Sequence, residues 1–518
     1  MNRRRDVRRG ATLLAVLGLS GALIGVPAAT ADEGTAPATP LAWGECPADV
    51  PNDPPLLQCA TVPVPLDYGD PDGERIEIMI SRLPSFNPEQ RRGILLLNPG
   101  GPGGSGLDLS TLLSSQGLPN SVLAGYDLIG VDPRGVGHSA PVSCGFTADD
   151  TDYFGNIPPY AVDEAAVAEQ ARIAQGVAEQ CAANDVDGRL RHLSTANTAR
   201  DLDSIRAALG EEKASFLGYS YGSALGAAYA SMFPDTADRV VLDSNIGDTH
   251  LDYEGIRRFG LGLEEMFPDF ADWAAARHDS YELGSTPEEV RETYFDIAER
   301  LDENPVEGVV DGTLFRLATF GGLYREASYG RTAQLWQSVS VSDPAAQDVL
   351  ALLDADLPVL PSGPPTGASE PSAFDNSWSA FLAVTCNDAE WPEDVETYQR
   401  GVAEDREAYP LFGAAAANIM PCAYWQEPLE EPVEIESDGP TNVLIVQNQR
   451  DPATPSRGGE LLDEKFGDRS RLVSVDGSGH GVYVLGDNPC ALNVTTRFLV
   501  HGDLPEKNIT CAADGTAG

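Results

Sequence analysis

Short apolar runs bounded by turn residues recur along this chain, and they restrict its fold more than any other feature. Each run is β-branched or aliphatic and is flanked by Gly, Pro, Asp or Asn, as buried parallel strands usually are. The runs lie at 93–97, 126–131, 214–217, 239–242, 442–446 and 471–475. An earlier segment, 75–83, alternates apolar and polar residues, which predicts a half-buried strand.

Helical patterns separate several of these runs. Apolar residues recur at helical spacing over 196–209, and 221–233 is rich in small residues. Alternating strands and helices predict an α/β fold with a doubly wound, mostly parallel sheet. The long segment 246–433 is the exception, because it carries helical pattern and a Pro-rich part, 357–371, between two predicted strands. We expect it to form a large, mainly helical lid inserted into the core.

The N-terminus has the composition of an export signal. Five arginines within the first nine residues precede an apolar run at 11–26, and Ala29 and Ala31 are the small residues that a signal peptidase reads. A membrane anchor is the alternative, but the run is short and is interrupted by glycine and serine. No later stretch is apolar enough to cross a membrane. We expect cleavage after Ala31 and a secreted protein without membrane contact.

The chain length points to one core with one insertion. At 518 residues it exceeds an ordinary domain, yet it contains no Gly/Ser linker and no internal repeat. The Pro-rich stretch from 32 to about 65 is expected to wrap the surface. The predicted organisation is a signal peptide at 1–31, a first core part at 32–245, a lid at 246–433 and a second core part at 434–518.

The eight cysteines fit an exported protein, because none forms a C-x-x-C pair and their number is even. Short loops close at the lowest entropic cost, so pairing between neighbours in sequence is expected. The predicted disulfides are Cys46–Cys59, Cys144–Cys181, Cys386–Cys422 and Cys490–Cys511. A metal–thiolate site is the alternative, but it lacks both ligand spacing and a nearby histidine cluster.

The net charge of -46 excludes some partners. Nucleic acids and anionic membranes would be repelled. The acidity fits two interpretations: substrates with a positive end, or solubility in a secreted or salty setting.

Ser220 lies in the pattern Gly218-Tyr219-Ser220-Tyr221-Gly222, which follows a predicted strand and opens a predicted helix. The pattern alone is weak, since 52 residues are glycine and chance can supply it. Its place between strand and helix is the setting of a nucleophile elbow, a strained turn that presents a serine hydroxyl. We predict that Ser220 is the nucleophile of a hydrolase.

Asp451 and His480 occupy the places that the partners of such a serine require. A serine needs a histidine base held by a carboxylate, and here the acid and then the histidine should follow it along the chain. Asp451 follows the predicted strand 442–446, and His480 follows 471–475. The competing interpretation is that both are ordinary loop residues, but of six histidines only His480 has this place. We predict that His480 is the base and that Asp451 fixes its tautomer.

A tetrahedral intermediate needs N–H donors for its oxyanion. One donor is expected from Tyr221, the residue after the nucleophile. The second is expected from the glycine-rich loop 98–106, in which we assign Gly101 because glycine lets the backbone approach closely.

The same loop also supports a rival function. Gly101, Gly103 and Gly106 match a dinucleotide-binding fingerprint, and the next predicted strand ends in Asp132. NAD binding would leave the serine constellation unexplained, a secreted enzyme has no cofactor pool, and Pro102 stiffens the turn. We therefore predict no cofactor. Without an H-E-x-x-H motif we also predict no metal.

The segment 127–139 is polar and rich in turn residues after a strand. We expect a structural network in which Arg134 binds nearby carbonyl or carboxylate groups, rather than a catalytic role.

Together these segments resemble the exported tripeptidyl aminopeptidases of actinomycetes, relatives of the proline iminopeptidases within the α/β hydrolases. The matching pieces are 98–106, 127–139, 218–222, 449–455 and 477–481, and the resemblance spans nearly the whole mature chain. The more specific patterns are G-G-P-G, D-P-R-G-x-G-x-S and R-D-P-x-T-P. Pro99 is a departure, since iminopeptidases commonly carry histidine there.

The resemblance implies an α/β-hydrolase fold and a serine exopeptidase that releases short peptides, tripeptides among them, from free N-termini. Such an enzyme must bind the substrate ammonium group, so acidic lid residues are expected near the site. The candidates are Glu264, Glu265, Asp388 and Glu390. A secreted esterase or amidase for small acyl substrates is the alternative enzyme, and a binding protein on a hydrolase scaffold is a third hypothesis. A monomer is assumed.

Overall fold

The computed structural model describes residues 41–51, 56–147, 157–306, 309–340 and 371–517. The predicted signal peptide, 1–31, and nearly all of the Pro-rich stretch 357–371 lie outside these residues. The described residues all fall within the unit Pro40–Gly518.

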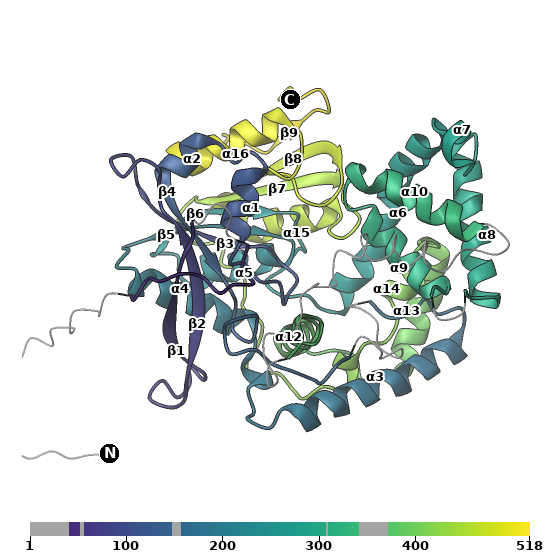
Figure 1. Ribbon diagram of the computed structural model, residues 1–518, viewed down its shortest axis with the longest axis horizontal. Helices are drawn as coiled ribbons and strands as arrows, with labels where there is room; N and C mark the ends of the chain where they lie inside the picture. The colour runs from purple at the N-terminus through teal and green to yellow at the C-terminus, as the bar shows by residue number, and fades with distance from the viewer. Residues whose placement is uncertain (1–40, 52–55, 148–156, 307–308, 341–370, 518) are drawn as a thin grey trace, which may run out of the picture. The chain divides into compact units, whose positions relative to one another are not determined.

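The described strands form one nine-stranded sheet in the order β1-β2-β4-β3-β5-β6-β7-β8-β9 (Figure 1). Their bounds are β1 Gln58–Pro65, β2 Arg75–Leu83, β3 Gly93–Asn98, β4 Tyr126–Val131, β5 Ala214–Tyr219, β6 Ala237–Asp243, β7 Val443–Arg450, β8 Ser470–Ser478 and β9 Ile509–Cys511. β2 pairs antiparallel with β1 and β4, and all other neighbours are parallel. All the predicted strands are present, and the mostly parallel sheet confirms the predicted α/β-hydrolase fold.

The expectation that residues 32 to about 65 only wrap the surface is wrong for the end of that stretch. Gln58–Pro65 is the edge strand β1, whose Ala60, Val62 and Val64 are buried. Pro63 and the final proline are tolerated because an edge strand can lack N–H donors on one side. The prolines therefore concealed a strand that its alternating burial reveals.

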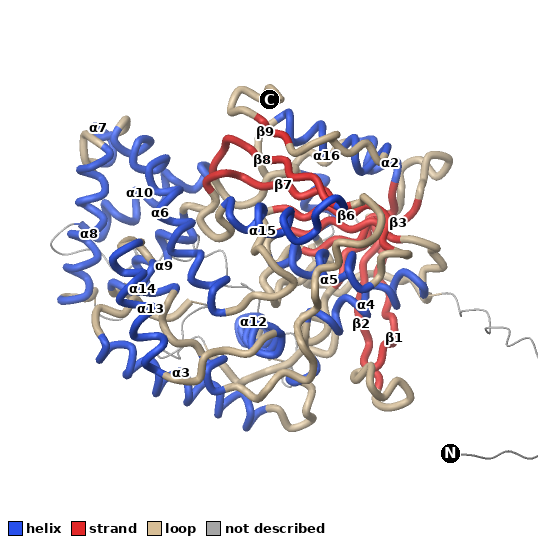
Figure 2. The backbone as a smooth tube through the Cα atoms, turned by 180° about the vertical axis from the view of Figure 1, so that it is seen from behind, coloured by secondary structure: helices blue, strands red, loops and turns tan. Residues whose placement is uncertain are grey.

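Side chains of the parallel strands alternate between two apolar cores, one on each face of the sheet. Ile94 and Leu96 of β3 enter one core, whereas Leu95 and Leu97 enter the other. The helices of the two layers are seen from opposite sides in Figures 1 and 2. The first core includes residues of α4 (Thr195–Ala208), α5 (Tyr221–Met232) and α15 (Ser456–Phe466), and the second includes residues of α1 (Leu109–Ser115), α2 (Asn120–Gly125) and α16 (Pro489–His501).

The two predicted helices of the core correspond to α4 and α5. Ser194 caps α4 by accepting a hydrogen bond from the Asn197 N–H. Small residues let α5 lie against the sheet: a Cβ at Gly226 would come within 2.5 Å of side-chain carbons of Phe216 and Leu242. This close packing places the start of α5 directly beyond the end of β5.

A helical insertion separates β6 from β7 (Figures 1 and 2). Its aromatic side chains extend the first core, and Phe267, Phe270 and Tyr294 pack around the buried Trp336. Its described helices are α6 Tyr253–Ala275, α7 His278–Tyr281, α8 Pro287–Glu303, α9 Gly312–Gly322, α10 Tyr329–Ser340, α12 Ala373–Asp388, α13 Val395–Ala408 and α14 Gly413–Ala416. The insertion has the helical character expected of the lid.

A long helix that precedes α4, α3 (Glu164–Asn184), lies beside this insertion (Figure 1). The segment leading into it is bonded to the insertion, because the Asn418 side chain donates to the Pro159 carbonyl at 2.8 Å and Tyr160 donates to the Pro410 carbonyl at 3.1 Å. Sequence patterning placed this region in the core and did not reveal the contact.

The four predicted disulfides are present, and no cysteine in the described chain is free. Complete pairing is typical of proteins from an oxidising compartment. Within the described ranges, no helix combines the length and apolar character needed to cross a membrane.

Arg134 forms the predicted structural network. Its fully buried guanidinium donates to both carboxylate oxygens of Asp201 at 2.7 Å. It also donates to the carbonyl oxygens of Leu66 at 2.9 Å and His192 at 3.1 Å. One residue therefore joins the loop after β4, the end of β1 and the start of α4.

Replacing Arg134→Met should lower the free energy of unfolding by about 3–5 kcal/mol, because Asp201 would stay buried without its cation. Chemical denaturation of the purified protein measures the change. Arg172→Met is the matched control, since its ion pair with Glu169 is exposed and should contribute below about 1 kcal/mol. Equal effects of the two substitutions would contradict this role of Arg134.

Candidate active site

Ser220 occupies a sharp turn between β5 and α5. Its φ of 58° and ψ of -124° are strained for a residue with a side chain. Glycine is required on both sides: a Cβ at Gly218 would lie 2.3 Å from the Gly222 carbonyl oxygen, and one at Gly222 would lie 2.9 Å from the Asn98 side chain. The strand–turn–helix setting predicted for this serine is present.

Asp451 and His480 lie together, as the sequence predicts. Both carboxylate oxygens of Asp451 lie 3.0 Å from His480 Nδ1. Asp451 is fully buried and also accepts from the Ala453 and Thr454 N–H groups at 3.0 and 2.9 Å. With Nδ1 directed at the carboxylate, Nε2 is the nitrogen left for proton transfer.

Thr454 contacts both Asp451 and His480, and sequence reasoning did not predict this residue as part of the site. Its hydroxyl donates to Asp451 Oδ2 at 2.8 Å and lies 3.3 Å from His480 Nδ1. The R-D-P-x-T-P pattern contained this threonine, and its position three residues after the acid was the available signal.

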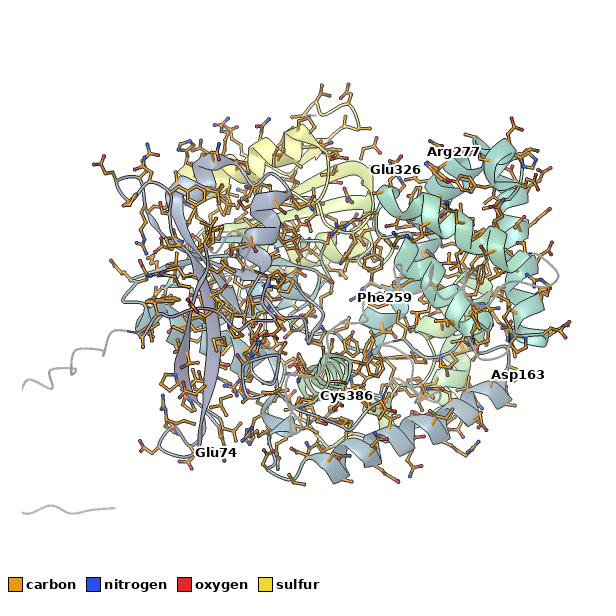
Figure 3. The ribbon with its side chains drawn as sticks, viewed as in Figure 1. Glu74, Asp163, Phe259, Arg277, Glu326 and Cys386 are labelled. Carbon is orange, nitrogen blue, oxygen red and sulfur yellow. A yellow bond between two sulfur atoms is a disulfide. The ribbon has the colours of Figure 1, made fainter. Side chains whose placement is uncertain are left out.

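Ser220 and His480 line the same pocket, which has a volume of about 600 Å³. The structure gives no hydrogen bond between them, and such bonds are often long in unliganded enzymes. The remaining walls come from the glycine loop after β3, from residues 49–51 and 136–138, and from Tyr324 and α12 of the insertion. The helix α12 can be located in Figure 3 by the label of Cys386, which lies near its end. The pocket can therefore present a carbonyl group to the serine.

Gly101 and Tyr221 lie on the glycine loop and at the start of α5, and their role as oxyanion donors stays a prediction. Tyr221 begins α5, so its N–H has no acceptor within the helix. The glycine loop lies against it, since a Cβ at Gly100 would be 3.2 Å from the Tyr221 nitrogen. Among the described groups, none accepts from the Gly101 N–H.

Asp132 anchors this glycine loop. Its buried carboxylate accepts from Ser105 Oγ, from the Gly106 N–H at 3.2 Å and from the His138 N–H at 2.8 Å. Desolvation raises the pKa of Asp132, and these hydrogen bonds oppose the shift. The acidic residue that completed the dinucleotide-binding fingerprint is thus bonded to the glycine loop itself.

Asp243, at the end of β6, joins the two halves of the site and was not predicted. Its carboxylate accepts from the Val482 and Tyr483 N–H groups at 2.9 and 2.7 Å, two and three residues after His480. Its carbonyl oxygen accepts from the Ser220 N–H at 2.9 Å. Burial raises the pKa of Asp243 to about 7 against the effect of these bonds. An acid at the end of a buried strand was the only sequence signal.

The four acidic residues predicted to bind an ammonium group lie outside the described lining of this pocket. Glu264 is paired with Arg291, and Glu265 and Glu390 are exposed. Asp388 is buried and accepts from the Thr195 N–H at 2.7 Å. Their role in binding an amine stays a prediction. The carboxylates that do line the pocket are those of Asp49 and Asp108.

Asp388 is instead connected to the residue after Ser220. The Thr195 hydroxyl lies 2.6 Å from Asp388 and 2.5 Å from the Tyr221 hydroxyl. Burial raises the pKa of Asp388 to about 7, and the Thr195 hydrogen bonds oppose the shift. The end of α12 thus supports the start of α5.

In the described part of the chain, no group of three or more His, Cys, Asp or Glu residues could hold a metal ion.

The fold and this site define a serine hydrolase of the α/β-hydrolase class. The chain is 35% identical over 485 residues to a tripeptidyl aminopeptidase of Streptomyces coelicolor, covering 92% of this chain and 86% of that protein. It therefore belongs to the tripeptidyl aminopeptidase-like family, and the family described as "TAP-like protein" matches residues 409–511.

Two mycobacterial relatives are more distant. The serine protease Hip1 of Mycobacterium tuberculosis is 29% identical over 493 residues, covering 91% of each chain. A carboxylesterase B of the same species is 29% identical over 471 residues, covering 88% of this chain and 86% of that protein. Relatives thus carry both peptidase and esterase names.

Asp388 should make stability depend on pH. Its folded pKa of about 7 lies above the ordinary value of 3.8, so its contribution is fully present below about pH 4 and is lost as the pH rises through 7. Between pH 8 and pH 5, this group should raise the free energy of unfolding of the wild type by about 2 kcal/mol. Asp388→Asn should lack that rise. Denaturant titrations at both pH values measure this. Exposed Glu390→Gln is the control, and identical pH dependence of wild type and Asp388→Asn would contradict the prediction.

Proposed function

We propose that this protein is a secreted serine exopeptidase that releases tripeptides from free N-termini through an acyl-enzyme. The observation that carries the proposal is the buried Asp451–His480 pair on the same pocket as the strained Ser220. Similarity to a tripeptidyl aminopeptidase over most of both chains supports the substrate class. Complete cysteine pairing supports action outside the cell after removal of residues 1–31.

The proposed reaction begins when Ser220 Oγ attacks the scissile carbonyl carbon. His480 Nε2 takes the hydroxyl proton, while Asp451 fixes the tautomer and stabilises the imidazolium. The N–H groups of Tyr221 and Gly101 bind the oxyanion. When the C–N bond breaks, His480 returns the proton to the leaving amine, and the tripeptide stays bound as an ester of Ser220. A water molecule, deprotonated by His480, then hydrolyses that ester.

The acidic pocket supports recognition of a free amine. Asp49 and Asp108 line it, and among its described lining residues there is no lysine or arginine. The Asp49 carboxylate lies 3.1 Å from His138, whereas the Asp108 side chain does not cap α1 although it precedes that helix. An extended tripeptide is about 10 Å long, and the pocket of about 600 Å³ that Ser220 lines offers space for a segment of this size.

Esterase or amidase action on small acyl groups is the second candidate. The same serine, histidine and aspartate perform both reactions, and one relative carries the name carboxylesterase B. The two functions differ in whether a free amine is needed.

Tripeptide anilides with free and with blocked amino groups distinguish the two functions. We expect cleavage of the free substrate, with release of the intact tripeptide detected by mass spectrometry. A fluorophosphonate probe should label the wild type but not Ser220→Ala, because the probe reacts with an activated serine. Equal cleavage of both anilides would exclude the exopeptidase, and labelling of Ser220→Ala would exclude the assigned nucleophile.

Asp108→Asn should raise KM for the free tripeptide anilide about 10-fold with little change in kcat, because a charge-assisted bond to the ammonium group is lost. Steady-state kinetics measure the change. Hydrolysis of p-nitrophenyl acetate, which has no amine, should keep its rate, and Glu169→Gln, which removes an exposed carboxylate outside the pocket lining, serves as the matched variant. An unchanged KM in Asp108→Asn would remove Asp108 from amine binding.

A further inference from the structure

The loop that carries His480 is held by backbone hydrogen bonds on both sides of the residue. After it, the N–H groups bind Ser244 and Asp243 of the core, with Gly481 donating to Ser244 Oγ at 2.8 Å. Before it, the Gly479 N–H donates to the Arg450 carbonyl oxygen at 2.8 Å. The N–H of His480 itself donates to a residue of the insertion.

That residue is Tyr324, whose carbonyl oxygen accepts from the His480 N–H at 2.7 Å. The phenol ring of Tyr324 also packs edge-on against the imidazole, with ring centroids 4.9 Å apart and an interplanar angle of 71°. Gly479 makes room for this contact, because a Cβ there would lie 2.7 Å from the Tyr324 oxygen. Backbone and side chain of one residue thus restrain the histidine together.

The insertion holds Tyr324 firmly. Tyr324 lies two residues beyond the end of α9, and its ring packs edge-on against Phe320 of that helix at 5.5 Å. Phe320 in turn stacks on Phe412 at 4.6 Å and on Phe259 of α6 at 5.7 Å. Figure 3 labels Phe259 and Glu326. Glu326 lies two residues beyond Tyr324, where the insertion approaches the sheet.

An ion pair fixes the insertion to the core near the same loop. Arg450, whose carbonyl oxygen accepts from Gly479, donates through its side chain to Asp269 of α6 and Asp476 of β8 at 2.8 and 2.9 Å. The distance between α6 and the histidine loop is therefore set by more than the Tyr324 contact alone.

We propose that Tyr324 is a positioning residue through which the helical insertion sets the backbone and ring orientation of His480. The inference rests on the proposed roles of Ser220 and His480. Asp451 fixes one edge of the imidazole by a hydrogen bond, and the Tyr324 ring restricts its rotation about the side-chain bond. The insertion consequently forms part of the catalytic machinery in addition to the pocket wall.

Replacing Tyr324→Ala removes the ring and tests the proposal. We expect kcat for the free tripeptide anilide and the rate of fluorophosphonate labelling of Ser220 to fall together, about 10-fold or more, with KM little changed, because a small misplacement of a catalytic group costs this much. Tyr324→Phe keeps the ring and should restore both rates. Tyr281→Ala is the control, because this tyrosine of the insertion packs on Trp273 and does not line the pocket.

Thermal unfolding establishes that the variants are folded, and Tyr324→Leu replaces the alanine variant if that one does not fold. A higher KM with an unchanged labelling rate would show that Tyr324 only contacts substrate, and would overturn the proposal. So would loss of activity in Tyr324→Phe equal to that in Tyr324→Ala, because the hydroxyl would then be responsible. A wild type that takes no label at Ser220 would instead overturn the proposed function, independently of Tyr324.

Discussion

The contacts of Asp243 are the constraint on which the rest of the site depends. Ser220 and His480 are far apart in sequence, yet each is bonded through its own backbone segment to this one residue at the end of β6. A buried carboxylate is costly unless hydrogen bonds compensate for lost water. Here the N–H groups of Val482 and Tyr483 offset the cost. The same hydrogen bonds give these backbone groups an acceptor and stabilise the buried carboxylate of Asp243.

The insertion extends this arrangement. α12 is bonded to the loop after β4 through Asn376, whose side chain accepts from the Gly137 N–H at 2.8 Å and donates to the Gly135 carbonyl oxygen at 2.8 Å. Its backbone also closes over the glycine loop, because a Cβ at Gly103 would lie 2.5 Å from the Ser377 oxygen. A helix held in this way acts as a fixed wall of the pocket. Together with Tyr324, it brings two parts of the insertion into the pocket of the predicted nucleophile.

Sequence reasoning anticipated the positions of residues whose place follows from local order. The turn at Ser220 and the meeting of Asp451 with His480 were predictable because each residue follows a recognisable strand and the fold dictates their order along the chain. β1 was missed because its prolines obscured an alternation that only an edge position permits. Asp243 was missed because its partners are backbone N–H groups, which every residue has and no pattern marks. The ammonium-binding candidates were chosen by charge, and charge does not tell that Asp388 is directed at Thr195.

The choice between peptidase and esterase therefore lies in the pocket walls, since the reacting groups serve both. Asp108 follows the glycine loop and Asp49 belongs to the N-terminal segment of the core. The residues that the resemblance favoured for amine binding belong instead to the insertion. Without a lysine or arginine in the described lining, a peptide ammonium group would gain charge pairing that a neutral acyl ester cannot. The net charge of -46 adds a field that favours the same end of the substrate. Specificity for a free N-terminus would then arise from two core carboxylates acting within a general negative potential, and the insertion would contribute shape and the position of His480.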